Sequence, residues 1–337
     1  MGSGDKRRVG KRRVFYIPGY DPIHPRRYRE LYRREAARQA AISGYDIALR
    51  PRAKSRNYGW HVTGEFDGAV VETEVEVLVW SDIVRTSMSS SIPATYAQLV
   101  RTAWTYIASG ALRRLMRLRK GPVIAALYPV GMLLLQLLAA ILTGWLVYAL
   151  AGLLAPWAGL ATLLAGAGAG IVAAVALLRW FKAKDGKLYA YYLMHDYAYS
   201  ARLKGANPPE LEARMAEFTD IVADALLAPG DEVLVVGHSS GAHLAVSILA
   251  DLIRQGRVPA NGPALSFLSL GQVVPMVSFL PKANRLRADL RYLSARKELT
   301  WVDVTAPGDG CAFALCDPVA VSGVAPKDKR WPLVFSA

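Results

Sequence analysis

The sequence predicts an α/β protein with a mostly parallel sheet, helices on both faces of that sheet, and an inserted pair of membrane-spanning helices. Three observations lead to this prediction. Strand-like runs alternate with amphipathic helix patterns after residue 210, which is typical of parallel sheets. Short runs rich in β-branched residues also occur in the first 80 residues. Between these parts, the 58 residues from Gly121 to Leu178 contain no Asp, Glu, Lys or Arg.

Composition excludes several other classes. Hydrophobic residues make up 53% of the 337 residues, which is too much for an intrinsically disordered chain. Two cysteines, Cys311 and Cys316, are too few for a disulfide scaffold. No cluster of Cys and His with metal-ligand spacing occurs, so we expect no metal and no cofactor.

The part before the uncharged run is expected to begin with a basic tail, residues 1–13, followed by the first part of an α/β domain, residues 14–120. No apolar stretch long enough for a secretion signal follows the tail. Four elements are expected in residues 14–120: strands Val14–Ile17 and Val70–Trp80, and helices Arg26–Ser43 and Tyr96–Leu118.

The uncharged run predicts a transmembrane hairpin over residues 121–181. A spanning helix needs roughly 20 apolar residues, so 58 residues suit two spans and a turn. We expect helices near Val123–Leu153 and Gly159–Leu178, with the turn near Pro156. Gly166 and Gly170 form a pair of small residues four apart, which suits either packing within the hairpin or the face of a homodimer.

Charges beside the hairpin predict its orientation. Basic residues flank both ends, so both ends are expected at the cytoplasmic side of the inner membrane, in a multi-pass topology. Residues 1–120 contain 23 Lys and Arg against 11 Asp and Glu, so most of the net charge of +14 lies upstream of the spans. Attraction to anionic lipid explains this charge better than nucleic-acid binding, and we expect no nucleic-acid partner.

The second part of the α/β domain is expected over residues 182–337. Tyrosines cluster between residues 189 and 199, where they could lie at the membrane interface. The elements expected beyond them are a helix, Leu211–Leu227, and four strands: Glu232–Val236, Leu265–Leu270, Leu299–Val304 and Leu333–Phe335.

One motif indicates chemistry. The apolar strand ending at Val236 runs into Gly237-His238-Ser239-Ser240-Gly241, and a helix pattern over Ala242–Leu252 follows. This is G-x-S-x-G between a strand and a helix. Small residues are needed there because strand and helix approach closely at a sharp turn that exposes the serine hydroxyl.

On these residues the chain resembles the α/β-hydrolase fold family of serine hydrolases, in its lipase- and esterase-like part. The resemblance suggests a bacterial, membrane-anchored member with the hairpin as an insertion. It implies that Ser239 is the nucleophile and that the N–H of Ser240 is one oxyanion donor. The second donor is expected from the loop after the first strand, where Tyr20 follows Pro18-Gly19. Many members of the family carry His where this chain has Pro18.

The resemblance also implies an acid after a later strand. Asp309 lies in the loop just past strand Leu299–Val304 and is the first candidate, with Asp317 and Asp303 as alternatives. Such an acid holds a catalytic histidine in the useful tautomer.

No histidine follows Asp309, although the family places its catalytic His after the final strand. Three explanations stay open: the domain lacks its C-terminal end, His195 acts from a lid, or the protein is a non-catalytic relative. His243 and His238 are poorer bases, because one lies a helical turn beyond Ser239 and the other points away from it.

These residues together predict a membrane-bound serine hydrolase that cleaves an acyl ester through an acyl-enzyme on Ser239. The expected partners are the lipid bilayer and a lipid or other amphipathic acyl ester. The alternative is a catalytically inactive, hydrolase-like membrane protein that binds a ligand or acts as a scaffold.

Overall fold

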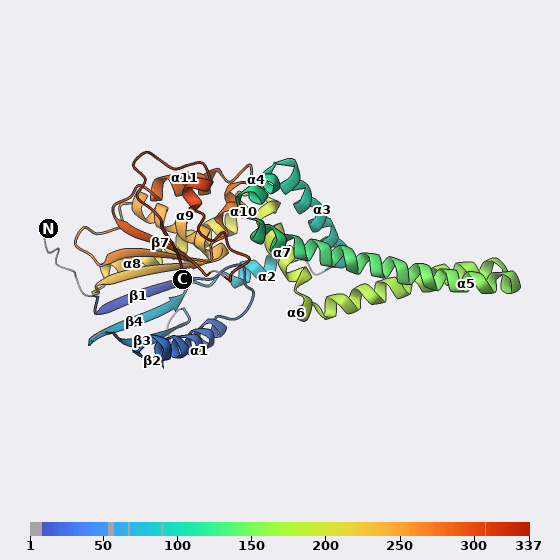
Figure 1. The fold of residues 1–337 in the computed structure, drawn as a ribbon, viewed down its shortest axis with the longest axis horizontal. Coiled ribbons are helices and arrows are strands. Elements are labelled where there is room, and N and C mark those ends of the chain that lie inside the picture. Colours follow the sequence, from blue (N-terminus) through green and yellow to red (C-terminus); the bar gives the residue numbers. More distant parts are fainter. Residues whose placement is uncertain (1–8, 53–56, 67, 89–90, 307) are drawn as a thin grey trace.

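The structure is a computed structural model that describes residues 9–337 apart from 53–56, 67, 89–90 and 307, with the backbone alone for 154–158 (Figure 1). It is an α/β fold built on one eight-stranded mixed sheet with the order β2-β3-β4-β1-β5-β6-β7-β8. The strands are β1 (Lys11–Ile17), β2 (Asp46–Pro51), β3 (Gly59–Phe66), β4 (Ala69–Val77), β5 (Glu232–His238), β6 (Ala264–Leu270), β7 (Leu299–Thr305) and β8 (Leu333–Ser336).

Strands from both sides of the predicted insertion share this sheet. β1 is central and pairs in parallel with β4 and with β5. The parallel arrangement continues through β6, β7 and β8, whereas β2, β3 and β4 form an antiparallel meander. The sheet is therefore mostly parallel, as expected, and its parallel half carries the G-x-S-x-G turn.

Helices lie on both faces of the sheet (Figure 1). The helices before the hairpin are α1 (Arg26–Ser43), α2 (Ser81–Ser87), α3 (Ile92–Ala108) and α4 (Ala111–Leu118), and α5 (Lys120–Ala183) is the hairpin itself. Those after it are α6 (Asp185–Leu188), α7 (Ala190–Arg202), α8 (Pro209–Leu227), α9 (Ser240–Arg254), α10 (Val274–Ser278), α11 (Asn284–Leu293) and α12 (Pro318–Val321).

The main core lies between the sheet and helices α8, α9 and α11. Phe15, Phe267 and Trp301 from the strands pack there against Leu249 and Leu290 from the helices, and all five are almost completely buried. A smaller core on the opposite face joins α1 to the meander. Burial on both faces explains why the central strands read as continuous apolar runs.

The apolar run forms two long helices that extend away from the sheet (Figure 1). Lys120–Leu153 and Gly159–Ala183 each contain an 18-residue stretch with a mean hydropathy of 2.2, and both helices are long enough to cross a membrane. The non-helical backbone between them lies at Gly159, three residues after the expected turn at Pro156, because its φ of 71° and ψ of −163° suit glycine.

Both glycines of the small-residue pair pack inside the hairpin. A Cβ at Gly170 would lie 2.5 Å from the carbonyl oxygen of Gly144, and one at Gly166 would lie 2.3 Å from Cβ of Ala151. Small residues here allow the two helices to approach closely. The homodimer stays a prediction, but Gly166 and Gly170 do not support it because they pack within the hairpin.

Three other expectations need correction. The expected helix Tyr96–Leu118 is two helices, because Gly110 adopts a φ of 71° between α3 and α4. β1 begins at Lys11, inside the predicted tail, where Asp231 accepts hydrogen bonds from the N–H groups of Gly10 and Lys11 at 2.8 Å. The pair β2–β3 was not expected, although burial alternates along both of its strands.

Candidate active site

Ser239 lies on a strained turn between β5 and α9. Its φ of 54° and ψ of −119° form a combination that only glycine adopts without strain. Its N–H donates to the carbonyl oxygen of Leu270 at 2.9 Å, which ties the turn to the end of β6. A non-glycine residue held in this conformation indicates a position where the identity of the side chain matters.

Neighbouring glycines make this turn possible. A Cβ at Gly241 would lie 2.1 Å from the carbonyl oxygen of Ile17, and one at Gly237 would lie 2.7 Å from Cα of Ala242. A Cβ at Gly19 would lie 3.1 Å from Cβ of Ser239. The glycines therefore bring β1, its following loop and α9 together at the serine.

The two predicted oxyanion donors flank Ser239. Ser240 is the first residue of α9, and Tyr20 belongs to the loop that touches Ser239 through Gly19. Among the residues that the structure describes, the N–H groups of Tyr20 and Ser240 have no hydrogen-bond acceptor. Two unpaired N–H groups beside a serine hydroxyl are what an oxyanion hole requires.

Hydrogen bonds hold the Tyr20 loop in place. The Trp80 indole donates to the carbonyl oxygen of Pro18 at 2.9 Å. The Tyr192 hydroxyl donates to the carbonyl oxygen of Tyr20 at 2.6 Å, and the Tyr20 hydroxyl lies 2.7 Å from Oγ of Ser87. Contacts to both the backbone and the side chain of Tyr20 restrict the direction of its N–H.

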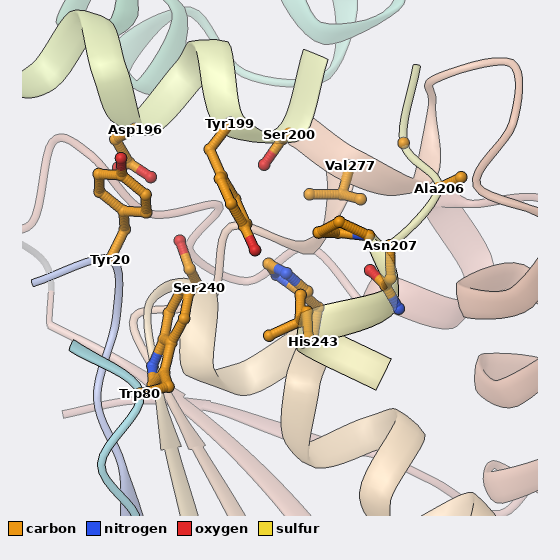
Figure 2. A pocket seen from close by; sticks show the side chains of 13 residues that line it. Tyr20, Trp80, Asp196, Tyr199, Ser200, Ala206, Asn207, Ser240, His243 and Val277 are labelled. Carbon is orange, nitrogen blue, oxygen red and sulfur yellow. The ribbon is translucent and has the colours of Figure 1, made fainter. Parts of the chain in front are cut away.

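A cavity of about 330 Å³ lies over Ser239. Residues of α7 and α10 form its walls, and Pro122, in the first turn of the first apolar helix, also lines it. A smaller cavity adjoins it, with Tyr20 and Asp196 at one end and His243 and Asn207 at the other (Figure 2). The serine thus faces a cavity at the base of the hairpin.

The three candidate acids occupy different environments. Asp309 Oδ1 accepts from the N–H groups of Cys311 and Ala312 at 2.9 and 3.2 Å, at the edge of the cavity that Cys311 lines. Asp317 caps α12 and pairs with Lys329 at 2.7 Å, which is a structural role. Asp303 is fully buried in β7, where burial raises its pKa to about 6.

Two histidines, His195 and His243, do not line the cavity that contains Ser239. The imidazole Nδ1 of His195 lies 2.7 Å from Oε1 of Gln98 on α3, and His195 lines a separate cavity without Ser239. A lid role for His195 at Ser239 therefore has no support in this arrangement. His243 is buried in α9, and burial lowers its pKa to about 4.

His238 lines the cavity beside Ser239. Its ring stacks on Tyr16 with the centroids 6.3 Å apart. Burial against protein lowers its pKa, and the carboxylates of Asp309 and Asp21 oppose that shift. Asp309 is therefore close enough to favour the charged form of the His238 imidazole, but His238 precedes Ser239 directly in the chain.

The sequence analysis missed Asp196. The tyrosine-rich stretch forms α7, whose Tyr192, Asp196 and Tyr199 share one face and line the cavities. A place at the membrane interface stays a prediction for the exposed Tyr189, just before α7. Burial raises the pKa of Asp196 to about 7. The spacing of these residues at four and three positions was the available evidence for an inward-facing helix.

The described residues contain no group of three or more His, Cys, Asp or Glu side chains arranged to hold a metal. No protein-family model, curated protein or solved structure matches this chain. Function must therefore be argued from the site itself.

Proposed function

We propose that this protein is a membrane-bound serine hydrolase of the α/β-hydrolase type that cleaves acyl esters of lipids or other amphipathic molecules. The observation that carries the proposal is the strained backbone of Ser239 next to two unpaired N–H groups. Backbone strain at a half-buried serine has no benefit for stability, so it favours a chemical role.

The reaction would proceed in two steps. Ser239 Oγ bonds to the acyl carbon while its proton passes to a general base, and the N–H groups of Tyr20 and Ser240 stabilise the oxyanion. The bond to the alcohol then breaks, and the alcohol leaves with a proton. Water attacks the acyl-enzyme, releases the carboxylic acid and restores the Ser239 hydroxyl.

The order of the elements supports this assignment. The nucleophile follows β5, one oxyanion donor follows the adjacent strand β1, and Asp309 follows β7. This agrees with the arrangement in α/β-hydrolases, in which the acid follows the nucleophile along the chain. Asp309 is accordingly the proposed acid, at the edge of the cavity.

Membrane placement rests on the exposed apolar helices. Only 17% and 11% of the most apolar windows of the two helices are buried within the protein, whereas a core helix of a soluble protein is mostly buried. The bilayer is the environment that suits such surfaces. The basic flanks favour a cytoplasmic domain at the inner membrane. Because Pro122 lines the cavity, an ester entering from the cytoplasmic leaflet would meet Ser239 near the membrane surface.

Labelling with a fluorophosphonate probe tests the proposal, because the probe reacts only with an activated serine. Wild-type protein in membranes should be labelled, and Ser239→Ala should not. Ser43→Ala, at the exposed end of α1, is the control and should be labelled like wild type. Equal labelling of wild type and Ser239→Ala would contradict the proposal.

One observation favours the second candidate, a ligand-binding membrane protein without turnover. Among the described residues, none forms a hydrogen bond with Oγ of Ser239, so no base is in place. A serine without a base is a weak nucleophile. An unlabelled wild-type protein that still binds ligands in the Ser239 cavity would favour this candidate.

A further inference from the structure

The cavity over Ser239 has an unusual lining. Six tyrosines contribute to it: Tyr16, Tyr20, Tyr28, Tyr106, Tyr192 and Tyr197. They come from β1, the loop after it, α1, α3 and α7, so residues far apart in the sequence converge there. Such a concentration of one residue type is not needed to fill space, because aliphatic side chains would do so without buried hydroxyls.

Two carboxylates stand among these rings. Asp21 is already engaged, since the Tyr28 hydroxyl donates to it at 2.8 Å and an Arg27 nitrogen lies 3.9 Å away. Asp196 differs, because among the described residues no hydrogen bond or ion pair reaches its carboxyl group. The phenols of Tyr20, Tyr106, Tyr192 and Tyr197 are close enough for the charge of Asp196 to raise their pKa values, together with burial.

The charge of the cavity opposes that of the protein. The chain carries a net charge of +14, yet the described residues that line the cavity include two carboxylates and one cationic side chain, that of Arg27. A negative potential inside a basic protein attracts a cation and disfavours an anion. Burial raises the pKa of an unpaired carboxyl group, as it does for Asp196, and a cationic ligand would favour the ionised form of that group.

We propose that this cavity binds a quaternary ammonium group, and that the esters cleaved at Ser239 carry one. Tyrosine rings attract such a cation through their electron-rich faces, and a carboxylate adds a direct charge interaction. A trimethylammonium group needs no hydrogen-bond acceptors, which matches a cavity with rings on several sides and one free carboxylate. The assignment of the substrate rests on the proposed hydrolase function, whereas cation binding does not.

Binding is therefore measured in the Ser239→Ala protein, which removes turnover from the experiment. Isothermal titration calorimetry on the protein in detergent micelles compares the affinity for choline with that for 3,3-dimethyl-1-butanol, the neutral carbon isostere of choline. Choline should bind at least about ten-fold more tightly, because the isostere lacks the charge that the rings and Asp196 attract. Equal affinities, or no binding of choline, would overturn the proposal.

Two substitutions separate the charge from the rings. Asp196→Asn should weaken choline binding by about ten-fold or more, while Asp224→Asn, an exposed carboxylate on α8, should leave it unchanged. Tyr197→Leu should weaken it by about two- to five-fold, and Tyr197→Phe should retain most of it because the ring stays. If Tyr197→Phe and Tyr197→Leu weaken binding equally, the rings do not bind the cation.

The source of the ammonium group is tested with wild-type enzyme on two pairs of esters. Butyrylcholine is compared with 3,3-dimethylbutyl butyrate, and micellar lysophosphatidylcholine with lysophosphatidylglycerol. Preference for the cationic member of the first pair indicates a soluble choline ester, and preference in the second pair indicates a choline lipid. Cleavage without preference in either pair would overturn the substrate assignment. If wild-type protein is not labelled by the fluorophosphonate probe but still binds choline, the proposed hydrolase function is refuted and the proposed cation-binding site is kept.

Discussion

The strain at Ser239 leads to a prediction that does not depend on any substrate. Ser239→Ala and Ser239→Gly both remove the hydroxyl, but only glycine relaxes at a φ of 54° and ψ of −119°. A strained non-glycine residue costs about 1–3 kcal/mol. Glycine loses about 0.5–1 kcal/mol through its greater freedom in the unfolded chain. We therefore expect Ser239→Gly to be more stable than Ser239→Ala by about 0.5–2 kcal/mol.

Thermal unfolding in detergent, followed by tryptophan fluorescence, measures this difference. In a large domain 1 kcal/mol corresponds to a shift of roughly 2–4 °C in Tm, so the expected gap is resolvable. The same pair of substitutions at Ser240, the first residue of α9, is the control. There glycine should be the less stable variant, because the backbone is helical. A Tm of Ser239→Gly equal to or below that of Ser239→Ala would refute the argument from strain.

Three further predictions concern burial and packing. The pKa of His243 falls from 6.5 to about 4 on folding, so the unfolded chain binds the proton first and stability is lost as pH falls below 6.5. Between pH 7.5 and pH 5, protonation of this group should lower the free energy of unfolding by about 2 kcal/mol. Denaturant titration should therefore show that the stability of His243→Leu depends less on pH than that of wild type. An equal pH dependence of both proteins would contradict the lowered pKa of His243. Gly241→Ala should destabilise the fold by about 2 kcal/mol or more and abolish probe labelling, because its Cβ would lie 2.1 Å from a β1 carbonyl oxygen. Gly170→Ala should lower the Tm of the hairpin-containing protein, whereas Gly168→Ala, with no neighbouring atom within 4 Å, should preserve or raise it, and identical effects would argue against the observed helix packing.

Part of the site could be predicted from the sequence because its requirements are local. The strand, turn and helix around Ser239 are consecutive, and the small residues at Gly237 and Gly241 are needed wherever such a turn is built. The loop with Tyr20 was accessible for the same reason, since it directly follows a predicted strand. Parallel pairing of β1 with β5 then brings that loop to the serine.

The surroundings of Ser239 were not predictable in this way. His195 and Asp196 are adjacent in the chain, yet His195 turns toward Gln98 on α3 while Asp196 lines the cavity. Both orientations depend on how α7 packs against α3 and α5, and that packing is made by residues far apart in the sequence. The packing partner of Gly166 and Gly170 could not be predicted either, because their spacing of four residues suits a helix of the same chain as well as a helix of a second copy.

The hairpin and the turn at Ser239 could be predicted because each depends on consecutive residues. The hairpin is indicated by a long uncharged run with charges at its ends, and the turn by small residues between a strand and a helix. A cavity is different, because its walls are assembled from elements far apart in the chain and no single stretch of sequence contains them. The tyrosines around Asp196 acquire a common role only when folding brings β1, α1, α3 and α7 together. Long-range packing thus decides which side chains surround the cavity, whereas consecutive residues decide where Ser239 lies.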